Sequence, residues 1–600
     1  MNKEDFDAAN WQDIISECNE KMCYKYSSEF LRKAREAEEK TDLKNKTIFQ
    51  FLGLITRNPL IFDRERRERI FNLKNCIEKI DDQYNDQYIE ILKELIQETS
   101  DAEMKARIAD IIWIKKKDNT FAIIAIDSYI KSSVILEDPE KWVDCCWRIK
   151  RAIGLAKSLN NEDKLKSAVA HIETVLDKYN GKDPKYLSIS LMKLLQEYKQ
   201  GDPKKYVDLC KEIALDAEDN KNYHKAREAW ETKVRWHRLA KEEVEAKESL
   251  KNMAETYVKK AKDDTNATSP NYINACINIE EAIKEFQKIG NEKKRIEELH
   301  KLLLKYQPKI FTQMEPIEFE IKIKKEEIEE VKKIVQGKSF QDSIYALSFI
   351  KKPPKVSKLR EEVEKNAKAF PLAHIFGRKI LNEEGKNIGK GEPMSTGEED
   401  LESYMFEQAK ICHLNYFLYL IDPIRLQINQ DHNNVQIDDL LPIVSDNLFI
   451  PSGRECIYAS GLYAGLKGDF LTSAHLLIPQ LENSMRFILY HKGTIVSGFD
   501  KDGIQDEYDI NKTLRMQELV EIIDEDTIFD LKGLLIEKNG GSNLRNKMAH
   551  GLISYSEYTT SFEIKYLWWI TLNLCYRAKI SSQRVNKKEQ EQEQEGKTRD

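Results

Sequence analysis

The chain has 600 residues, of which 41% are hydrophobic and 33% charged, with only 23 glycines and 15 prolines. This length exceeds what one hydrophobic core supports, and the composition favours several domains of long solvated helices over a β-sandwich or a disordered chain. The net charge is −7, which excludes a protein that binds nucleic acid through a positive charge spread over its whole surface. A phosphate-binding site therefore requires a local group of basic residues.

The ten cysteines are scattered, with no C-x-x-C pair and no zinc-finger spacing to histidine, which is typical of free thiols in a reducing compartment. The N-terminal stretch MNKEDFDAANWQDII contains no apolar signal-peptide core. The longest apolar run, at 566–576, is far too short to cross a bilayer. We therefore expect a soluble cytoplasmic protein without a membrane segment, and we predict no cofactor.

Residues 1–310 predict helix after helix. Apolar residues recur at helical spacing in 224–261, and helix–turn–helix patterns appear in 152–172 and 282–306, with a weaker one in 194–213. The turns lie about forty residues apart. This pattern predicts a solenoid of the tetratricopeptide type, a sensing or regulatory region that binds a partner. An irregular helical domain is the alternative.

The rest of the chain falls into three further predicted segments. Residues 311–400 predict connecting helices and one short β-hairpin near 374–388, where apolar and β-branched residues flank a Glu-Gly turn. Helices return over 401–582, and the charged, repetitive segment 583–600 predicts a disordered tail. The expected fold class is all-α.

Several familiar enzyme and ligand-binding motifs are incomplete or absent in this sequence. QGKSF (336–340) and EGKTR (595–599) resemble the end of a phosphate-binding loop, but they lack its first glycine and its preceding strand. DKDGIQDEYD (500–509) lacks the closing glutamate of a calcium loop, so we predict a solvated loop over 497–509. The sequence has no H-E-x-x-H and no nucleophile elbow. These absences disfavour an ATPase, a zinc hydrolase or a serine hydrolase.

The stretch GGSNLRNKMAHGL (540–552) has a different character. Two glycines end one segment, Ser542 or Asn543 can cap a new helix, and Leu544, Met548 and Leu552 form a predicted buried stripe. Asn543, Asn546 and His550 share another face of this helix, and Arg545 lies about a quarter-turn away.

This combination suits RNA cleavage. Arg545 at a helix N-terminus attracts phosphate, and His550 can move protons near neutral pH. A base could then deprotonate the ribose 2′-OH, whose oxygen attacks the adjacent phosphorus without a metal ion. A capped helix with a partly buried histidine is the structural alternative.

The run NLRNKMAHGL resembles the signature of the HEPN superfamily, whose ribonucleases carry arginine, usually a polar residue, and histidine four to six positions later. Here four residues separate Arg545 from His550, and asparagine follows the arginine. Segments 334–349, 374–389 and 449–493 are also similar to a bacterial HEPN subgroup of large proteins with this domain at the C-terminus. The resemblance covers about 315–580 and leaves the repeat-like half uncovered. It implies that residues 401–582 form the HEPN-like nuclease domain.

The resemblance implies a metal-independent endoribonuclease that leaves 2′,3′-cyclic phosphate and 5′-OH ends on its RNA substrate, a tRNA or mRNA. It implies a homodimer through the C-terminal domain, with two Arg/His motifs in one cleft. A toxin or antiviral defence effector fits this pattern, with the N-terminal half responding to a phage-derived or cellular trigger. The alternative is a non-catalytic scaffold that binds nucleotide or protein.

An upstream helix carries a second polar group. His475, Glu482 and Arg486 are spaced by seven and four, which places them on one helical face despite Pro479. Glu482 and Arg486 are expected to support the Arg545/His550 site by orienting the imidazole or binding RNA, and His475 is a further candidate. Their structural alternatives are an i,i+4 ion pair and a core histidine.

Overall fold

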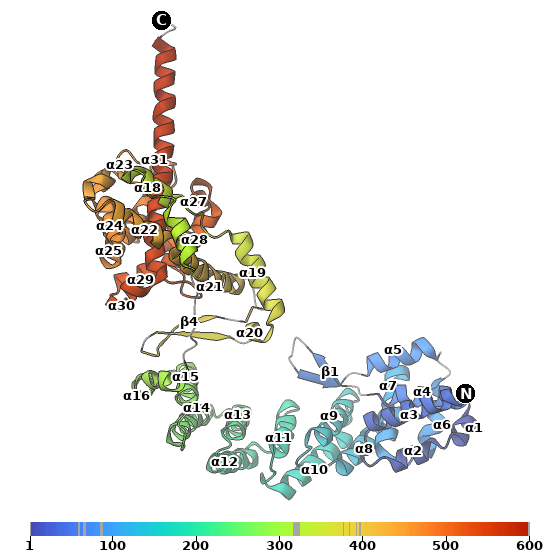
Figure 1. Cartoon of the computed structure of the whole chain (residues 1–600). Coiled ribbons are helices and arrows are strands. Elements are labelled where there is room, and N and C mark those ends of the chain that lie inside the picture. Colours follow the sequence, from blue (N-terminus) through green and yellow to red (C-terminus); the bar gives the residue numbers. More distant parts are fainter. Residues whose placement is uncertain are drawn as a thin grey trace. The chain divides into compact units, whose positions relative to one another are not determined.

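The computed structural model describes residues 2–57, 60–63, 68–71, 73–84, 88–315, 324–375, 377–382, 384–391, 393–394 and 398–597. The chain divides into two compact units, residues 1–313 and 314–600 (Figure 1). The described residues are mostly helical, and their strands form three separate two-stranded antiparallel pairs. The predicted all-α fold class is confirmed.

The first unit consists of consecutive helices and one hairpin. Its elements are α1 (Lys3–Ala8), α2 (Trp11–Glu17), α3 (Cys23–Glu39), α4 (Leu43–Ile55), β1 (Leu60–Asp63), β2 (Glu68–Phe71), α5 (Lys74–Gln83), α6 (Tyr88–Glu98), α7 (Ala102–Lys116), α8 (Asn119–Ile135), α9 (Val143–Ser158), α10 (Glu162–Tyr179), α11 (Leu187–Glu197), α12 (Pro203–Asp219), α13 (Tyr223–Leu239), α14 (Glu243–Asn266), α15 (Tyr272–Ile289), α16 (Lys293–Tyr306) and the 3₁₀ helix η1 (Gln307–Gln313).

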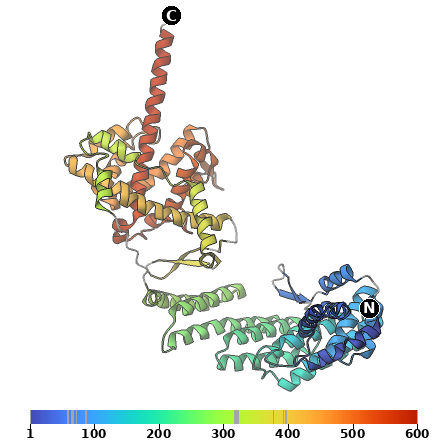
Figure 2. The same cartoon turned by 45° about the vertical axis from the view of Figure 1, so that its right-hand side comes forward.

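From α7 to α16, most helices pack on the next helix in the chain, and Figure 2 shows the later ones as a stack of roughly parallel rods. Similar turns join them: Asn160 and Lys221 adopt positive φ, and Asn161 and Asn222 then cap the next helix through a side-chain oxygen. A helix and a turn take about twenty residues, so a hairpin takes about forty. This arrangement fits a helical repeat, and the tetratricopeptide type stays a prediction.

The second unit is a helical bundle with two hairpins. Its elements are α17 (Lys325–Lys332), α18 (Phe340–Ser348), α19 (Val356–Ala369), α20 (Leu372–Ile375), β3 (Arg378–Leu381), β4 (Asn387–Gly391), α21 (Glu398–Tyr416), the π-helix η2 (Phe417–Ile421), α22 (Asp422–Asp431), η3 (Ile437–Leu440), α23 (Leu441–Val444), α24 (Glu455–Lys467), α25 (Phe470–His491), β5 (Ser497–Phe499), β6 (Gln505–Glu507), α26 (Ile510–Thr513), α27 (Gln517–Ile522), α28 (Glu525–Leu535), α29 (Leu544–Ala549), α30 (Tyr555–Thr560) and α31 (Phe562–Lys597).

The core of the second unit surrounds the first half of α31, which packs against α18, α21, α23, α24 and α25. Trp569 is fully buried there and donates its indole N–H to the carbonyl of Leu347 at 2.8 Å. Asn573 donates from Nδ2 to the carbonyl of Ser348, also at 2.8 Å. Residues 340–348, predicted as part of a separate connecting segment, therefore belong to this core.

The predicted hairpin near 374–388 is present as β3 and β4, which pair antiparallel with a register shift at Ile380 and Leu381. The hairpins β1–β2 and β5–β6 were not expected. The second of them, Ser497–Phe499 with Gln505–Glu507, lies in a segment that the sequence predicts as a solvated loop.

Helix α31 continues to Lys597 and projects beyond the bundle (Figure 1). The backbone of 583–597 thus differs from the predicted disordered tail, because glutamate, glutamine and lysine are strong helix formers; residues 598–600 lie outside the described residues. In the described part of the chain, no helix has both the length and the hydrophobicity to span a bilayer.

Candidate functional site

The two glycines before the R-N-x-x-x-H motif lie so close to neighbouring backbone atoms that a side chain would not fit at either position. Gly540 has φ +76°, and a Cβ atom there would lie 1.9 Å from the carbonyl oxygen of Ser403. A Cβ on Gly541 would lie 2.5 Å from the carbonyl oxygen of Glu537. Only glycine therefore fits where the chain leaves α28 and enters the motif.

The motif helix is shorter than predicted. Helix α29 ends at Ala549, His550 is its C-cap, and Gly551 has φ +65°. The Leu552 N–H bonds to the carbonyl of Lys547 at 2.8 Å, which closes the helix as a Schellman-type turn. Leu544 is buried and Met548 packs on the core, but Leu552 is 68% exposed, so its place in the predicted buried stripe is wrong.

The start of α29 also differs from the prediction. Asn543 occupies the N-cap with φ +50°, but its side chain caps no backbone N–H. Instead, Asn543 Oδ1 accepts a hydrogen bond from Nδ2 of Asn546 at 2.7 Å. A helix of six residues has only a small dipole, so attraction of an anion to this site depends on arginine side chains rather than on the helix N-terminus.

Glu482 brings two arginines together. Arg545 donates from Nε to Glu482 Oε2 at 3.0 Å, and Arg486 donates from Nη1 to Glu482 Oε1 at 3.2 Å. Arg545 also donates from Nη1 to Oδ1 of Asn546 at 3.2 Å. The structure thus joins four predicted residues, Glu482, Arg486, Arg545 and Asn546, through side-chain contacts between α25 and α29.

The arginine pair is partly exposed and lies beside further carboxylates, since Nε of Arg486 is 3.8 Å from Glu507. The side chains of Arg486 and Arg545 are 20% and 29% exposed, and the carboxylate between them is 13% exposed. Nη2 of Arg545 makes no hydrogen bond to any described residue. Asp509 lies near enough for the charge of Arg545, together with the larger effect of a hydrogen bond from Asn511, to lower the pKa of its carboxyl group.

His550 lies one turn after Asn546, and its backbone N–H bonds to the Asn546 carbonyl at 3.1 Å. The residue is exposed, and its imidazole has no hydrogen bond or ion pair with any residue in the described part of the chain. The alternative of a partly buried structural histidine is therefore wrong. Both ring nitrogens are available to a ligand.

His475 belongs to a neighbouring contact rather than to the arginine cluster. Its Nδ1 faces the Leu471 carbonyl at 2.9 Å, and its ring lies 5.0 Å from the ring of Tyr558 on α30. The residue is exposed, so it is not a core histidine. No contact joins it to Glu482 or to the motif.

Sequence reasoning also missed other contacts in this region. Arg486 donates from Nη1 to the backbone carbonyl of Tyr508 at 3.0 Å, and Lys547 lies 3.3 Å from the carboxylate of Glu557. The first acceptor is a main-chain oxygen, which any residue type supplies. Neither contact has a sequence signal.

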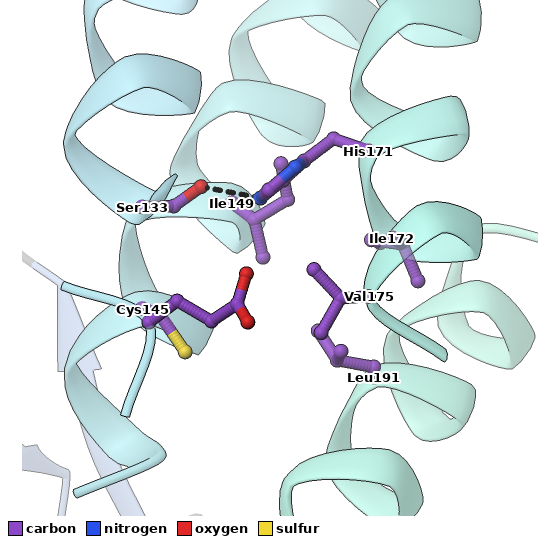
Figure 3. Close-up of a pocket in the computed structure, with 8 residues that line it drawn as sticks. Ser133, Cys145, Ile149, His171, Ile172, Val175 and Leu191 are labelled. Atoms are coloured by element: carbon purple, nitrogen blue, oxygen red, sulfur yellow. Dashed lines mark hydrogen bonds between the residues drawn. The ribbon is translucent and has the colours of Figure 1, made fainter. Parts of the chain in front are cut away.

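A second polar group lines a small cavity in the first unit (Figure 3). The hydroxyl of Ser133 lies 2.8 Å from Nε2 of His171, and burial lowers the pKa of this histidine. The cavity has a volume of about 10 Å³, roughly the space of one water molecule. A serine–histidine pair with so little space beside it cannot receive an ester or peptide substrate, so we assign it a structural role.

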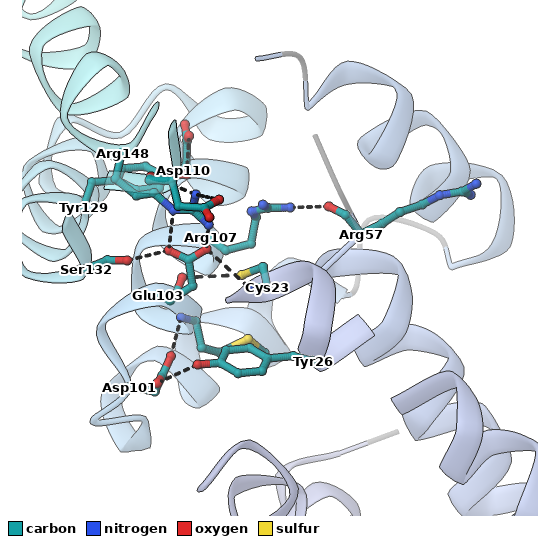
Figure 4. Close-up of polar contacts among 12 residues, drawn as sticks. Cys23, Tyr26, Arg57, Asp101, Glu103, Arg107, Asp110, Tyr129, Ser132 and Arg148 are labelled. Atoms are coloured by element: carbon teal, nitrogen blue, oxygen red, sulfur yellow. Dashed lines mark hydrogen bonds and ion pairs between the residues drawn. The ribbon is translucent and has the colours of Figure 1, made fainter. Parts of the chain in front are cut away.

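Buried ion pairs hold α7 to α9 (Figure 4). Arg148 donates to both oxygens of Glu103, from Nη2 at 2.7 Å and from Nε at 3.2 Å, and Ser132 adds a hydrogen bond at 2.6 Å. Arg151 makes the equivalent pair of bonds to Asp110 at 2.6 and 2.8 Å. Both carboxylates are almost completely buried, so these pairs are structural.

Comparison with known families gives one match. Residues 1–168 match the family described as Domain of unknown function (DUF7380), which covers less than a third of the chain. Comparisons with curated proteins and with solved structures find no match. The matched region contains the Glu103 and Asp110 ion pairs and none of the motif residues.

Proposed function

We propose that the second unit is a metal-independent endoribonuclease in which His550 and Arg545 act on the same phosphodiester. The observation that carries the proposal is the exposed His550 imidazole, which has no partner among the described residues and lies one turn from an arginine pair held by Glu482. A structural histidine is normally hydrogen-bonded, whereas a proton-transfer group needs a free nitrogen and access to solvent.

In the proposed reaction, His550 accepts the proton of a ribose 2′-OH as the 2′-oxygen forms a bond to the adjacent phosphorus. The bond from phosphorus to the 5′-oxygen breaks, that oxygen takes a proton from solvent, and the protonated His550 returns its proton to solvent. The products are a 2′,3′-cyclic phosphate and a 5′-OH end, and no water is consumed. Arg545 stabilises the negative charge that develops on the phosphorane through its free Nη2 group.

Glu482 and Arg486 are positioning residues in this proposal. Glu482 orients the Arg545 guanidinium by accepting from Nε, and with Nη1 bonded to Asn546 this leaves Nη2 for a phosphate oxygen. Arg486 pairs with Glu482 and also lies 3.8 Å from the carboxylate of Glu507, so it offsets acidic charge that would otherwise face Arg545. Asn546 fixes the second side of the Arg545 fork.

Replacing Arg545 by alanine should lower the rate of RNA cleavage about a hundredfold, since one charge-stabilising donor is worth roughly 3 kcal/mol in the transition state. Arg545→Lys should recover little, because an ammonium group keeps the charge and loses the fork. Cleavage of total RNA is measured in EDTA, and new ends are sequenced for 5′-OH groups. A requirement for magnesium with 5′-phosphate products contradicts the mechanism.

The matched control is Arg515→Ala. Arg515 lies in the same unit, is 57% exposed and pairs with Glu537 at 2.6 Å rather than with Glu482 or Asn546. It should leave cleavage unchanged, which separates a loss at the site from a general loss of positive charge.

We further propose that two copies of the second unit associate and that each Arg545 serves the His550 of the other copy. His550→Ala and Arg545→Ala proteins, each inactive alone, should then restore cleavage when they are mixed, because a mixed dimer regains one intact pair. Sedimentation at micromolar concentration should show a dimer. A monomer that still cuts RNA contradicts the shared site.

A non-catalytic scaffold is the second candidate function. It is favoured by the engagement of two of the three Arg545 nitrogens within the protein. In that case RNA or nucleotide binds through Arg545 with no turnover, and His550 variants bind as well as the wild type. The first unit is proposed to control either activity in response to a phage-derived or cellular signal.

A further inference from the structure

The first unit has a groove between α13 and α14 with a volume of about 480 Å³. Residues on one face of α13 form its first wall, from His224 to Arg238, and Leu250, Met253 and Tyr257 of α14 form the second. The α13 wall spans fourteen residues, about 21 Å at a helical rise of roughly 1.5 Å per residue. This length is greater than a small metabolite needs and suits an extended chain of about six residues.

One cation in the groove has an unsatisfied donor. The guanidinium of Arg227 lies 4.2 Å from the centre of the Tyr257 ring, and its Nη1 is buried with no hydrogen-bond partner among the described residues. That atom itself is closed to solvent, but Arg227 lines the groove and forms no ion pair with a described residue, so an anionic group of a ligand in the groove would pair with its charge. The stacked ring keeps the guanidinium in place before the ligand arrives.

The other charges of the groove are mostly paired internally. Glu228 forms an ion pair with Lys193, and Glu231 accepts from Arg235 at 2.5 Å. In the described part of the chain, the ion-pair contact of Arg238 is a distant one, 3.9 Å from the exposed Glu243. Two cations, Arg227 and Arg238, thus remain for a ligand, eleven residues apart along α13, which corresponds to about 16 Å.

The floor between these two arginines is apolar. Val234 is buried, and Leu250 and Met253 are half-buried beside it. A continuous polyanion such as RNA would meet the carboxylates of Glu228 and Glu231 along this stretch. A peptide with acidic side chains near its ends and apolar ones between matches the pattern of charge and hydrophobicity.

We propose that the groove between α13 and α14 binds an extended peptide segment of a protein partner, with acidic residues four to six positions apart on Arg227 and Arg238 and apolar side chains on Leu250 and Met253. At about 3.3 Å per residue, this separation matches the distance between the arginines. The proposal concerns the partner of the first unit and is independent of RNA cleavage by the second.

The test is selection from a displayed library of random nonapeptides on the full-length protein. The enriched pool should carry Asp or Glu at positions four to six apart with apolar residues between. The best peptide, fluorescein-labelled, should bind with an affinity that falls at least tenfold in Arg227→Met and in Arg238→Ala. Methionine is chosen at position 227 because it keeps an aliphatic side chain over the Tyr257 ring while removing the charge. Thermal unfolding followed by circular dichroism checks that each variant is folded.

The control variant is Arg32→Ala, which removes an exposed arginine on α3 and should leave peptide affinity unchanged. The proposal is overturned if no pool is enriched, if the pool is not acidic, or if Arg227→Met selects the same pool. It is also overturned if labelled octauridylate binds through Arg227 more tightly than the selected peptide does, since the groove would then be a nucleic-acid site.

Discussion

Replacing His550 by alanine should lower the rate of RNA cleavage by a factor of about 100 to 10,000, the range expected when a general base is removed. The imidazole has no partner among the described residues, so its loss breaks no contact of the folded unit. The variant should therefore unfold at the same temperature as the wild type and still bind RNA. Initial rates on a fluorogenic oligoribonucleotide measure the effect.

His491→Ala is the matched control. His491 is also exposed and lies at the end of α25 in the same unit. Its imidazole packs against the rings of Phe487 and Tyr490. Its removal should leave the rate unchanged. Equal rates for wild type and His550→Ala would show that cleavage, if present, takes place elsewhere in the protein.

Replacing Arg148 by methionine should destabilise the first unit by about 3–5 kcal/mol, because it leaves the Glu103 carboxylate buried without its partner. Glu103 is only 3% exposed, so solvent cannot compensate for the lost charge. Urea unfolding monitored by tryptophan fluorescence measures the change. The double variant Glu103→Met/Arg148→Met should recover most of the loss, since an apolar pair replaces the buried ion pair.

The same ion pair makes the first unit sensitive to acid. Burial by itself would raise the pKa of Glu103, but the charge and hydrogen bonds of Arg148 and the hydroxyl of Ser132 lower it to about 2. A folded-state pKa below the ordinary value of about 4.5 adds stability that is complete above pH 4.5 and disappears as the pH falls toward 2. The penalty of Arg148→Met should therefore shrink over that range, and an unchanged penalty would contradict this role of Glu103.

The helical character of both units could be predicted because it depends on local patterns. Apolar spacing and Asx caps such as Asn161 and Asn222 are visible in the sequence, whereas the positive φ of Lys221 is not. The hairpin β5–β6 was missed because its strands have three residues each and β6 is wholly exposed, so no apolar alternation marks it.

In the site, the contact of Arg545 with Glu482 could be anticipated from helical phase, since Glu482 and Arg486 share a face of α25. The end of α29 could not. The apolar stripe Leu544, Met548 and Leu552 predicts a longer helix, but Gly551 stops it and turns Leu552 outward. The apolar spacing favours a longer helix and the glycine favours an end at this point, and tertiary packing decides between the two. Here Ile553 is buried and Leu552 is exposed, so the helix ends.

The hydrogen bonds from α31 to the carbonyls of Leu347 and Ser348 have a practical consequence for dividing the gene. A fragment cut at residue 401, where the sequence places the start of the nuclease domain, would lack α18 and leave the indole of Trp569 and the amide of Asn573 without their acceptors. It would also uncover the apolar surface on which Ile344 and Leu347 pack. An independently expressed second unit therefore has to begin before α17, near residue 324.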